Sequence, residues 1–157
     1  MPKASCPEQT APSIRKATAA DVAAVLRIEG EQFSNPWRLE YFEAELANRI
    51  SHIFVSEDPG SGNVTGYLLF WRLGDELELH KIAGAGAWQG QGHASRLLDF
   101  FVRTARSWGS RRAVLEVRAN NTPAIRLYEK FNFRCVGRRR DYYDRPVEDA
   151  LLYELVL

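Results

Sequence analysis

The chain has 157 residues, of which 45% are hydrophobic and 26% are charged, and this suits one globular domain with a sizeable apolar core. Its 21 basic and 20 acidic side chains leave a net charge of +1, which excludes a basic surface for nucleic acid over the whole chain. No apolar run approaches the roughly 20 residues that span a bilayer, and residues 1–12 lack the pattern of a secretory signal, so we expect a cytoplasmic protein without a membrane partner.

The N-terminal third predicts a strand followed by two helices. Residues 1–12 are rich in Pro, Ser, Ala and Thr and are expected to be flexible. A short strand over residues 13–17 is followed by Thr18, which has the character of a helix N-cap with Asp21 as a weak capping-box partner. The apolar positions of this helix are Val22, Val25, Leu26 and Ile28.

A second helix is predicted to start at Asn35-Pro36, because proline is tolerated at the first helical position. Its apolar stripe consists of Leu39, Phe42 and Leu46. Three strands then form a predicted meander over residues 52–56, 64–73 and 76–83, with turns at 58–63 and 74–75. In the third strand the alternation assigns Leu77, Leu79 and Lys81 to one face, and Glu78, His80 and Ile82 to the other.

The rest of the chain alternates strands and helices. Residues 84–92 contain four glycines, and residues 94–108 predict a helix that ends at Gly109. One face of that helix carries Leu97, Leu98, Phe101, Val102 and Ala105. A strand over 113–117, a helix over 123–131 and strands over 133–136 and 150–156 complete the order β-α-α-β-β-β-α-β-α-β-β, with a polar, arginine-rich stretch between the last two. This order predicts a mixed α/β sheet with helices on both faces, in one domain over residues 13–157.

The glycine-rich segment before the long helix is a candidate phosphate site. Glycines let a backbone approach a ligand closely, and the first N–H groups of a helix are unpaired and lie at its positive end. Together they suit a pyrophosphate without a lysine. The sequence spells neither GxGxxG nor a Walker loop. Glycine content alone leaves a plain strand-to-helix connection equally open.

Two titratable residues lie in apolar surroundings. Glu116 interrupts an apolar strand, so its carboxylate is either paired structurally, with Arg118 as a candidate, or held as a base. Tyr128 lies on a helix face between Leu127 and Phe131, where a core tyrosine with a tethered hydroxyl is the alternative to a functional one. His80 is a rival base, although a histidine in a strand is more often part of the core or an edge.

These segments resemble the GNAT acetyltransferase superfamily. Gln89-x-x-Gly92-x-Ala94 is similar to its Q/R-x-x-G-x-G/A acyl-CoA pyrophosphate motif, and residues 115–133 resemble its V-R-x-x-N-x-x-A-I-x-L-Y-x-x-x-G-F signature. Asn35-Pro36-Trp37, together with Arg139-x-x-Tyr142-Tyr143 and the following Glu148-Asp149-Ala150, resembles the RimI-type N-terminal acetyltransferases. The resemblance covers about residues 13–157.

The resemblance implies an enzyme that transfers acetyl from acetyl-CoA to a protein N-terminal α-amine by direct attack, with a ribosomal protein beginning with alanine as the acceptor. It implies Glu116 as general base and Tyr128 as general acid. The implied acetyl-CoA-binding residues are Ile82, Ala83, Gly84, Gln89, Gly90, Gln91, Gly92, His93, Ala94, Asn121 and Tyr128. The implied acceptor groove is lined by Phe33, Trp37, Tyr142 and Tyr143.

This chain departs from the family pattern at two positions. Gly84-Ala85-Gly86 replaces the usual Val-Asp-Pro, which loosens the turn after the strand. Asn132 replaces the usual glycine, and asparagine tolerates the left-handed conformation better than most residues. Two other functions remain open at this point: acetylation of a small-molecule amine or a lysine, and a non-catalytic acyl-CoA-binding module. Arg138–Arg140 suits RNA, the 3′-phosphate of coenzyme A or a solvated face.

Overall fold

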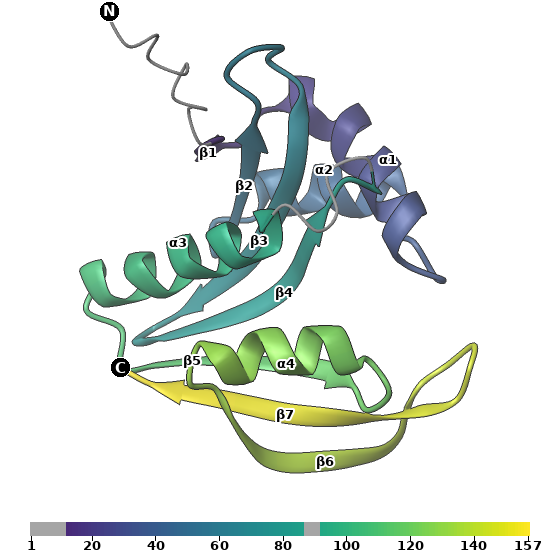
Figure 1. The fold of residues 1–157 in the computed structure, drawn as a ribbon, viewed down its shortest axis with the longest axis vertical. Helices are drawn as coiled ribbons and strands as arrows, with labels where there is room; N and C mark the ends of the chain where they lie inside the picture. Colours follow the sequence, from purple (N-terminus) through teal and green to yellow (C-terminus); the bar gives the residue numbers. More distant parts are fainter. Residues whose placement is uncertain (1–11, 87–91) are drawn as a thin grey trace, which may run out of the picture.

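The computed structural model describes residues 12–86 and 92–157, so the expected flexibility of the N-terminal segment falls almost wholly outside the described residues. The order of strands and helices is the predicted one (Figure 1). The elements are β1 (Ser13–Lys16), a 3-10 turn (Ala19–Asp21), α1 (Val22–Gln32), α2 (Leu39–Ala47), β2 (Ser51–Glu57), β3 (Val64–Leu73), β4 (Glu76–Gly84), α3 (His93–Ser107), β5 (Arg112–Arg118), α4 (Thr122–Lys130), β6 (Arg134–Tyr143) and β7 (Glu148–Val156).

The strands form one mixed sheet in the order β1-β2-β3-β4-β5-β7-β6. Neighbours pair antiparallel except β4 and β5, which are parallel over only four residue pairs, from Glu76 opposite Arg112 to Leu79 opposite Leu115. Beyond that point the two strands diverge, as Figure 1 shows. The sheet therefore forks in its middle, with β1–β4 on one side of the fork and β5, β7 and β6 on the other.

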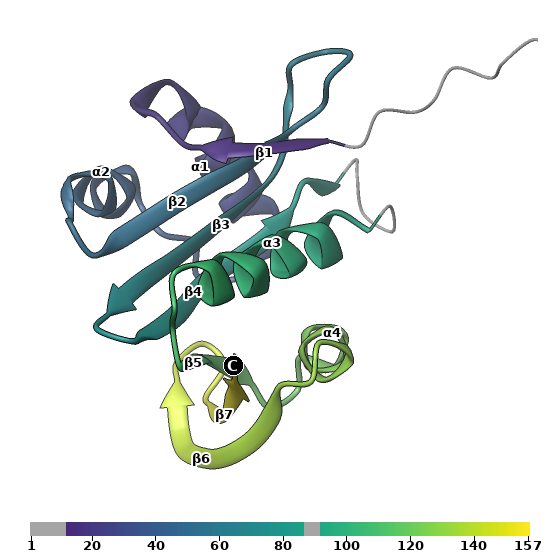
Figure 2. The ribbon, with the colours of Figure 1, turned by 90° about the vertical axis from the view of Figure 1, so that its left-hand side faces the viewer.

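Each face of the sheet has its own apolar core. Helices α1 and α2 cover one face, whereas α3 covers the other (Figure 2). All five residues of the predicted apolar face of α3 are buried, and Gly109 ends the helix with φ +71°. No helix in the described parts of the chain is long and apolar enough to cross a membrane.

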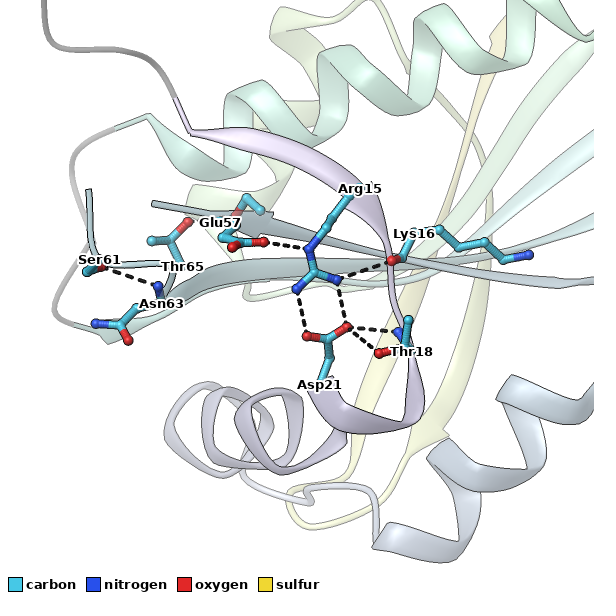
Figure 3. A network of polar contacts seen from close by, with 9 residues as sticks. Arg15, Lys16, Thr18, Asp21, Glu57, Ser61, Asn63 and Thr65 are labelled. Atoms are coloured by element: carbon cyan, nitrogen blue, oxygen red, sulfur yellow. Dashed lines mark hydrogen bonds and ion pairs between the residues drawn. The ribbon is translucent and has the colours of Figure 1, made fainter. Parts of the chain in front are cut away.

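The start of α1 is tied to the edge strand β1 by one arginine (Figure 3). The Arg15 guanidinium donates to both carboxylate oxygens of Asp21, at 2.8 and 2.9 Å, and also pairs with Glu57. The backbone N–H of Thr18 donates to Asp21 at 2.8 Å, so the carboxylate performs the predicted capping role. The hydrogen bond from Arg15 is the main reason why the pKa of Asp21 lies below its ordinary value.

A β-bulge in β4 corrects the predicted alternation of that strand. Leu69 of β3 lies opposite Lys81, but the next residue, Phe70, lies opposite Leu79, so His80 is the extra residue. Lys81 therefore reaches the α1 face, where it contacts Glu29, whereas the side chain of Ile82 packs against the core on the α3 face. The assignment of Lys81 to the face of Leu77 and Leu79 was wrong because simple alternation cannot anticipate a bulge.

Helix α2 begins later than predicted. Its first residue is Leu39, and Asn35-Pro36 lies in the connection before it. The backbone N–H of Trp37 donates to Glu29 Oε1 at 3.0 Å, which holds this connection extended against α1. Of the predicted stripe only Phe42 is buried, and Leu39 and Leu46 are exposed.

Strand β6 is longer than predicted. It runs over Arg134–Tyr143 and includes Arg138–Arg140, which the sequence had suggested to be a connection. Arg138 and Arg139 pair with Leu151 and Ala150 of β7. Because β6 is an edge strand with mostly exposed side chains, it lacks the apolar alternation by which strands are recognised.

Gly66 in β3 offers a test of packing beneath α3. A Cβ at this position would lie 2.8 Å from the Ala83 carbonyl oxygen and 3.0 Å from both Leu97 Cδ1 and Ser56 Oγ. We expect Gly66→Ala to lower the free energy of unfolding by about 1–3 kcal/mol through overpacking, measured by urea denaturation. The control Gly30→Ala meets nothing within 4 Å and lies inside α1, so it should stabilise by about 0.5–1 kcal/mol. Equal effects of the two variants would contradict the close contact.

Candidate active site

The fork between β4 and β5 is where the chemistry-bearing residues gather. The last paired residues, Leu79 and Leu115, both pack into the core beneath α3. Successive strand residues point to opposite faces, so His80 and Glu116, the next residues on each strand, turn toward the α1–α2 side. Past the fork, β4 continues through Ile82–Gly84 and pairs with β3, whereas its ladder with β5 has ended.

The N-terminus of α3 lies beside the end of β4. Gly92 is the N-cap residue, with φ +77°, and a Cβ built on Gly84 would lie 3.8 Å from His93 Cβ. The imidazole of His93 is buried, and burial is the main cause that lowers its pKa. Gln89, Gly90 and Gln91 lie outside the described residues. A left-handed glycine followed by a helix start suits an anion such as a phosphate, so the described part of the predicted loop fits this ligand class.

Glu116 is paired, but not with the arginine that the sequence suggested. Its Oε1 lies 3.3 Å from Arg139 Nε of β6, and 27% of its side chain is exposed. Arg118 instead pairs with Glu148 at 3.4 Å. The register across β7 explains the partner: Glu116 lies opposite Leu152, and Arg139 of β6 lies opposite Ala150, two residues before Leu152 on β7.

The two adjacent tyrosines at the end of β6, Tyr142 and Tyr143, lie near Glu116. The register of β6 against β7 shifts between Arg139 and Tyr143, and Asp141 has φ +50°. At this irregularity both Arg139 and Tyr142 approach the Glu116 carboxylate. A hydrogen bond from Tyr142 to Glu116 is the main cause that raises the pKa of Tyr142. Burial raises the pKa of Tyr143 to about 12, and its ring lies beneath the Arg118 guanidinium at 4.3 Å.

Tyr128 and Asn121 come from α4. Tyr128 is buried, with its ring 6.0 Å from that of Phe133, and burial raises the pKa of its hydroxyl well above the ordinary value. The hydroxyl therefore remains protonated and able to donate. Within residues 12–86 and 92–157 no hydrogen bond tethers it, unlike the tethered core tyrosine considered from the sequence. Asn121 is the N-cap of α4, where its side chain accepts from the Ala124 N–H at 3.3 Å.

On the α1–α2 side, Phe33 and Trp37 surround a buried ion pair that the sequence analysis did not find. Lys81 Nζ lies 2.7 Å from Glu29 Oε1, 4.1 Å from the centre of the Phe33 ring and 4.9 Å from that of Trp37. Glu29 is fully buried and also accepts from the Tyr67 hydroxyl. The sequence contains one sign that Glu29 is buried. It follows Val22 and Val25 at helical spacing and so lies on the apolar face of its helix.

Comparisons with known proteins identify the family and the fold. The Acetyltransferase (GNAT) family matches residues 22–133. The chain is 36% identical over 139 residues to N-alpha-acetyltransferase RimI of Mycobacterium tuberculosis, covering 85% of each protein.

Solved structures share the fold. The ribosomal-protein-S18-alanine N-acetyltransferase from Escherichia coli has a TM-score of 0.86 at 28% identity, covering 92% of this chain and 93% of that one. Arabidopsis thaliana NAA60 in complex with acetyl-CoA, at 19% identity, has a TM-score of 0.82 and covers 93% and 98%. The chain belongs to the GNAT acetyltransferase family and is an enzyme that transfers acetyl from acetyl-CoA to an amine.

Proposed function

We propose that this enzyme acetylates the N-terminal α-amine of a protein, with a ribosomal protein that begins with alanine as its acceptor. The observation that carries the proposal is the fork of the sheet, at which a carboxylate on β5 stands beside aromatic side chains from β6. The relatives from Mycobacterium tuberculosis and Escherichia coli are named for α-amine and ribosomal-protein-alanine acetylation, respectively. Phe33, Trp37, Tyr142 and Tyr143 supply the aromatic walls of an acceptor groove.

For acetyl-CoA we propose the edge of β4 past the fork and the start of α3. The backbone groups of Ile82, Ala83 and Gly84 that face away from β3 suit the amide-bearing arm of the molecule, and Asn121 and Tyr128 approach from α4. The N–H groups that follow Gly92, at His93 and Ala94, suit the pyrophosphate, together with Gln89, Gly90 and Gln91 outside the described residues. Acetyl-CoA supplies an acyl thioester, which an amine can attack directly.

Glu116 and Tyr128 handle the protons in this proposal. As the amine nitrogen bonds to the acyl carbon and the carbon–sulfur bond breaks, Glu116 accepts the amine proton and the Tyr128 hydroxyl donates one to the sulfur. Arg139 Nε lies 3.3 Å from Glu116 Oε1 and holds the carboxylate at the fork. An α-amine has a pKa near 7.7–8 and lysine one near 10.4, so at pH 7 the neutral fraction of an N-terminus is a few hundred times larger. One carboxylate base therefore suits an α-amine better than a lysine.

Three synthetic hexapeptides test the acceptor class. The first begins with a free alanine and contains no lysine, the second has a blocked N-terminus and one internal lysine, and the third combines a free alanine with the lysine. After incubation with acetyl-CoA, we expect mass spectrometry to show a 42 Da gain on the first and third only, as roughly expected from the amine pKa difference. Spermidine is assayed beside the peptides as a small-molecule amine. Acetylation of only the second peptide would indicate a lysine acceptor, and acetylation of only spermidine would indicate a small-molecule acceptor, in place of the N-terminal amine.

A further inference from the structure

The buried ion pair between Glu29 and Lys81 has no part in the proposed reaction. Lys81 has 13% of its side chain exposed and Glu29 none, and Lys81 Nζ lies 2.7 Å from Glu29 Oε1. The bulge in β4 brings Lys81 to the α1–α2 side, where the Tyr67 hydroxyl of β3 also donates to Glu29. A buried ion pair is often no more stabilising than apolar side chains of the same size, so stability alone does not account for this one.

The two aromatic residues of the α1–α2 connection, Phe33 and Trp37, each contact this pair through both backbone and ring. The backbone N–H of Phe33 donates to the main-chain carbonyl of Glu29 at 3.1 Å, and that of Trp37 donates to Glu29 Oε1 at 3.0 Å. The Lys81 ammonium lies over both rings, 4.1 Å from the centre of the Phe33 ring and 4.9 Å from that of Trp37. Glu29 therefore holds the two backbones, and Lys81 holds the two rings.

A cation shared by two rings restricts how both rings are oriented. An ammonium is attracted to the face of an aromatic ring, which is negative, and not to its positive edge. Because Phe33 and Trp37 share one ammonium, both must turn a face toward the same point. Glu29 fixes that point, since its carboxylate is fully buried and holds Lys81 Nζ at 2.7 Å. The position of the cation thus sets the orientation of one ring relative to the other.

We propose that Glu29 and Lys81 are positioning residues for the acceptor: they hold Phe33 and Trp37 in the orientation in which the two rings line the acceptor groove. This inference rests on the proposed function, because the groove belongs to that proposal. Neither residue of the pair takes part in the transfer of the acetyl group. Loss of the cation should therefore weaken acceptor binding and leave both the chemical step and acetyl-CoA binding unchanged.

The test uses a double variant, Glu29→Gln with Lys81→Met, which removes both charges and keeps side chains of similar size. The glutamine oxygen can still accept from the Trp37 N–H. We expect KM for the alanine hexapeptide to rise about tenfold, the order of one desolvated cation–π contact. We expect kcat and the dissociation constant of acetyl-CoA to stay within about twofold of the wild-type values, the pattern of a loss in binding alone. Steady-state kinetics and calorimetric titration give the three quantities.

Stability is measured on the same double variant, because it separates positioning from a purely structural role. Removal of both charges should recover part of the stability that Glu29→Gln loses, whereas KM should stay raised. A KM that returns to the wild-type value would overturn the proposal, and so would a lower kcat at unchanged KM. Lys81→Gln, which removes the cation and keeps a donor for Glu29, serves if the double variant does not fold.

Two further variants show which proposal a negative result concerns. Trp37→Leu removes one ring of the groove, and an unchanged KM would mean that the acceptor binds elsewhere, which would remove the proposed groove and this inference together. A raised KM for Trp37→Leu beside a wild-type KM for the double variant would overturn only the role of the pair. The matched control is Arg72→Met, which removes a cation 5.1 Å from the centre of the Trp108 ring on the α3 face and should leave KM unchanged.

Discussion

Glu116→Gln is expected to lower kcat by about 100-fold, the lower range for loss of a positioned general base, with the dissociation constant of acetyl-CoA unchanged within about twofold. Glutamine has the same size and can still contact Arg139, but it cannot accept the amine proton. Steady-state kinetics on the alanine hexapeptide and calorimetric titration with acetyl-CoA measure the two effects separately.

Glu154→Gln is the matched control for this variant. Glu154 is a partly exposed carboxylate in the same sheet and lies 3.4 Å from an arginine, Arg112, much as Glu116 lies 3.3 Å from Arg139. It lies on β7 opposite Val114, and its carboxylate pairs with Arg112 at the start of β5, before the strands part, so its loss should leave kcat unchanged. Equal turnover of wild type and Glu116→Gln from pH 6 to pH 9 would remove Glu116 from the role of base.

The second large effect is on stability. Glu29→Gln is expected to lower the free energy of unfolding by about 3 kcal/mol, because it leaves the ammonium of Lys81 without its buried partner. Lys81 has only 13% of its side chain exposed, so water compensates little. Guanidinium denaturation followed by tryptophan fluorescence gives the change, since Trp37 lies against the pair.

Two further variants separate the buried pair from ordinary surface charge. Glu29→Gln combined with Lys81→Met removes both charges and should recover part of the loss. Asp99→Asn breaks an exposed ion pair with Arg103 on α3 and should cost less than about 1 kcal/mol. A loss from Glu29→Gln as small as that from Asp99→Asn would show that Lys81 turns outward to water.

The parts of this fold that the sequence predicted are those in which local pattern and tertiary environment agree. Helix α3 has one apolar stripe against one core, so Leu97, Phe101 and Ala105 recur at the spacing of a helix and are buried. The meander and the order of elements follow in the same way from turn residues between apolar runs. The catalytic roles of Glu116 and Tyr128 stay predictions that rest on the family motif, and the structure places the two residues on β5 and α4.

The parts that the sequence did not predict depend on contacts between distant segments. The bulge at His80 reverses the faces of Lys81 and Ile82, and nothing in the letters of β4 marks it. The partner of Glu116, Arg139, lies on β6, whose exposed side chains do not alternate between apolar and polar. The sequence therefore predicted neither the full length of β6 nor the position of Arg139. Glu29 is ionic at an apolar position, and its partner lies 52 residues away.

The short parallel ladder has a thermodynamic consequence. Four residue pairs join β4 to β5, so the two halves of the sheet are held together there by little backbone bonding. An extended molecule with amide groups can add to the free edge of β4 as a strand would. Any ligand that binds the folded chain and not the unfolded one stabilises the fold by an amount that grows with the logarithm of its concentration, and here it would also add contacts where the two halves of the sheet share the fewest backbone hydrogen bonds. The enzyme should thus open first at the fork in native-state hydrogen exchange, and acetyl-CoA should slow that opening more than any other.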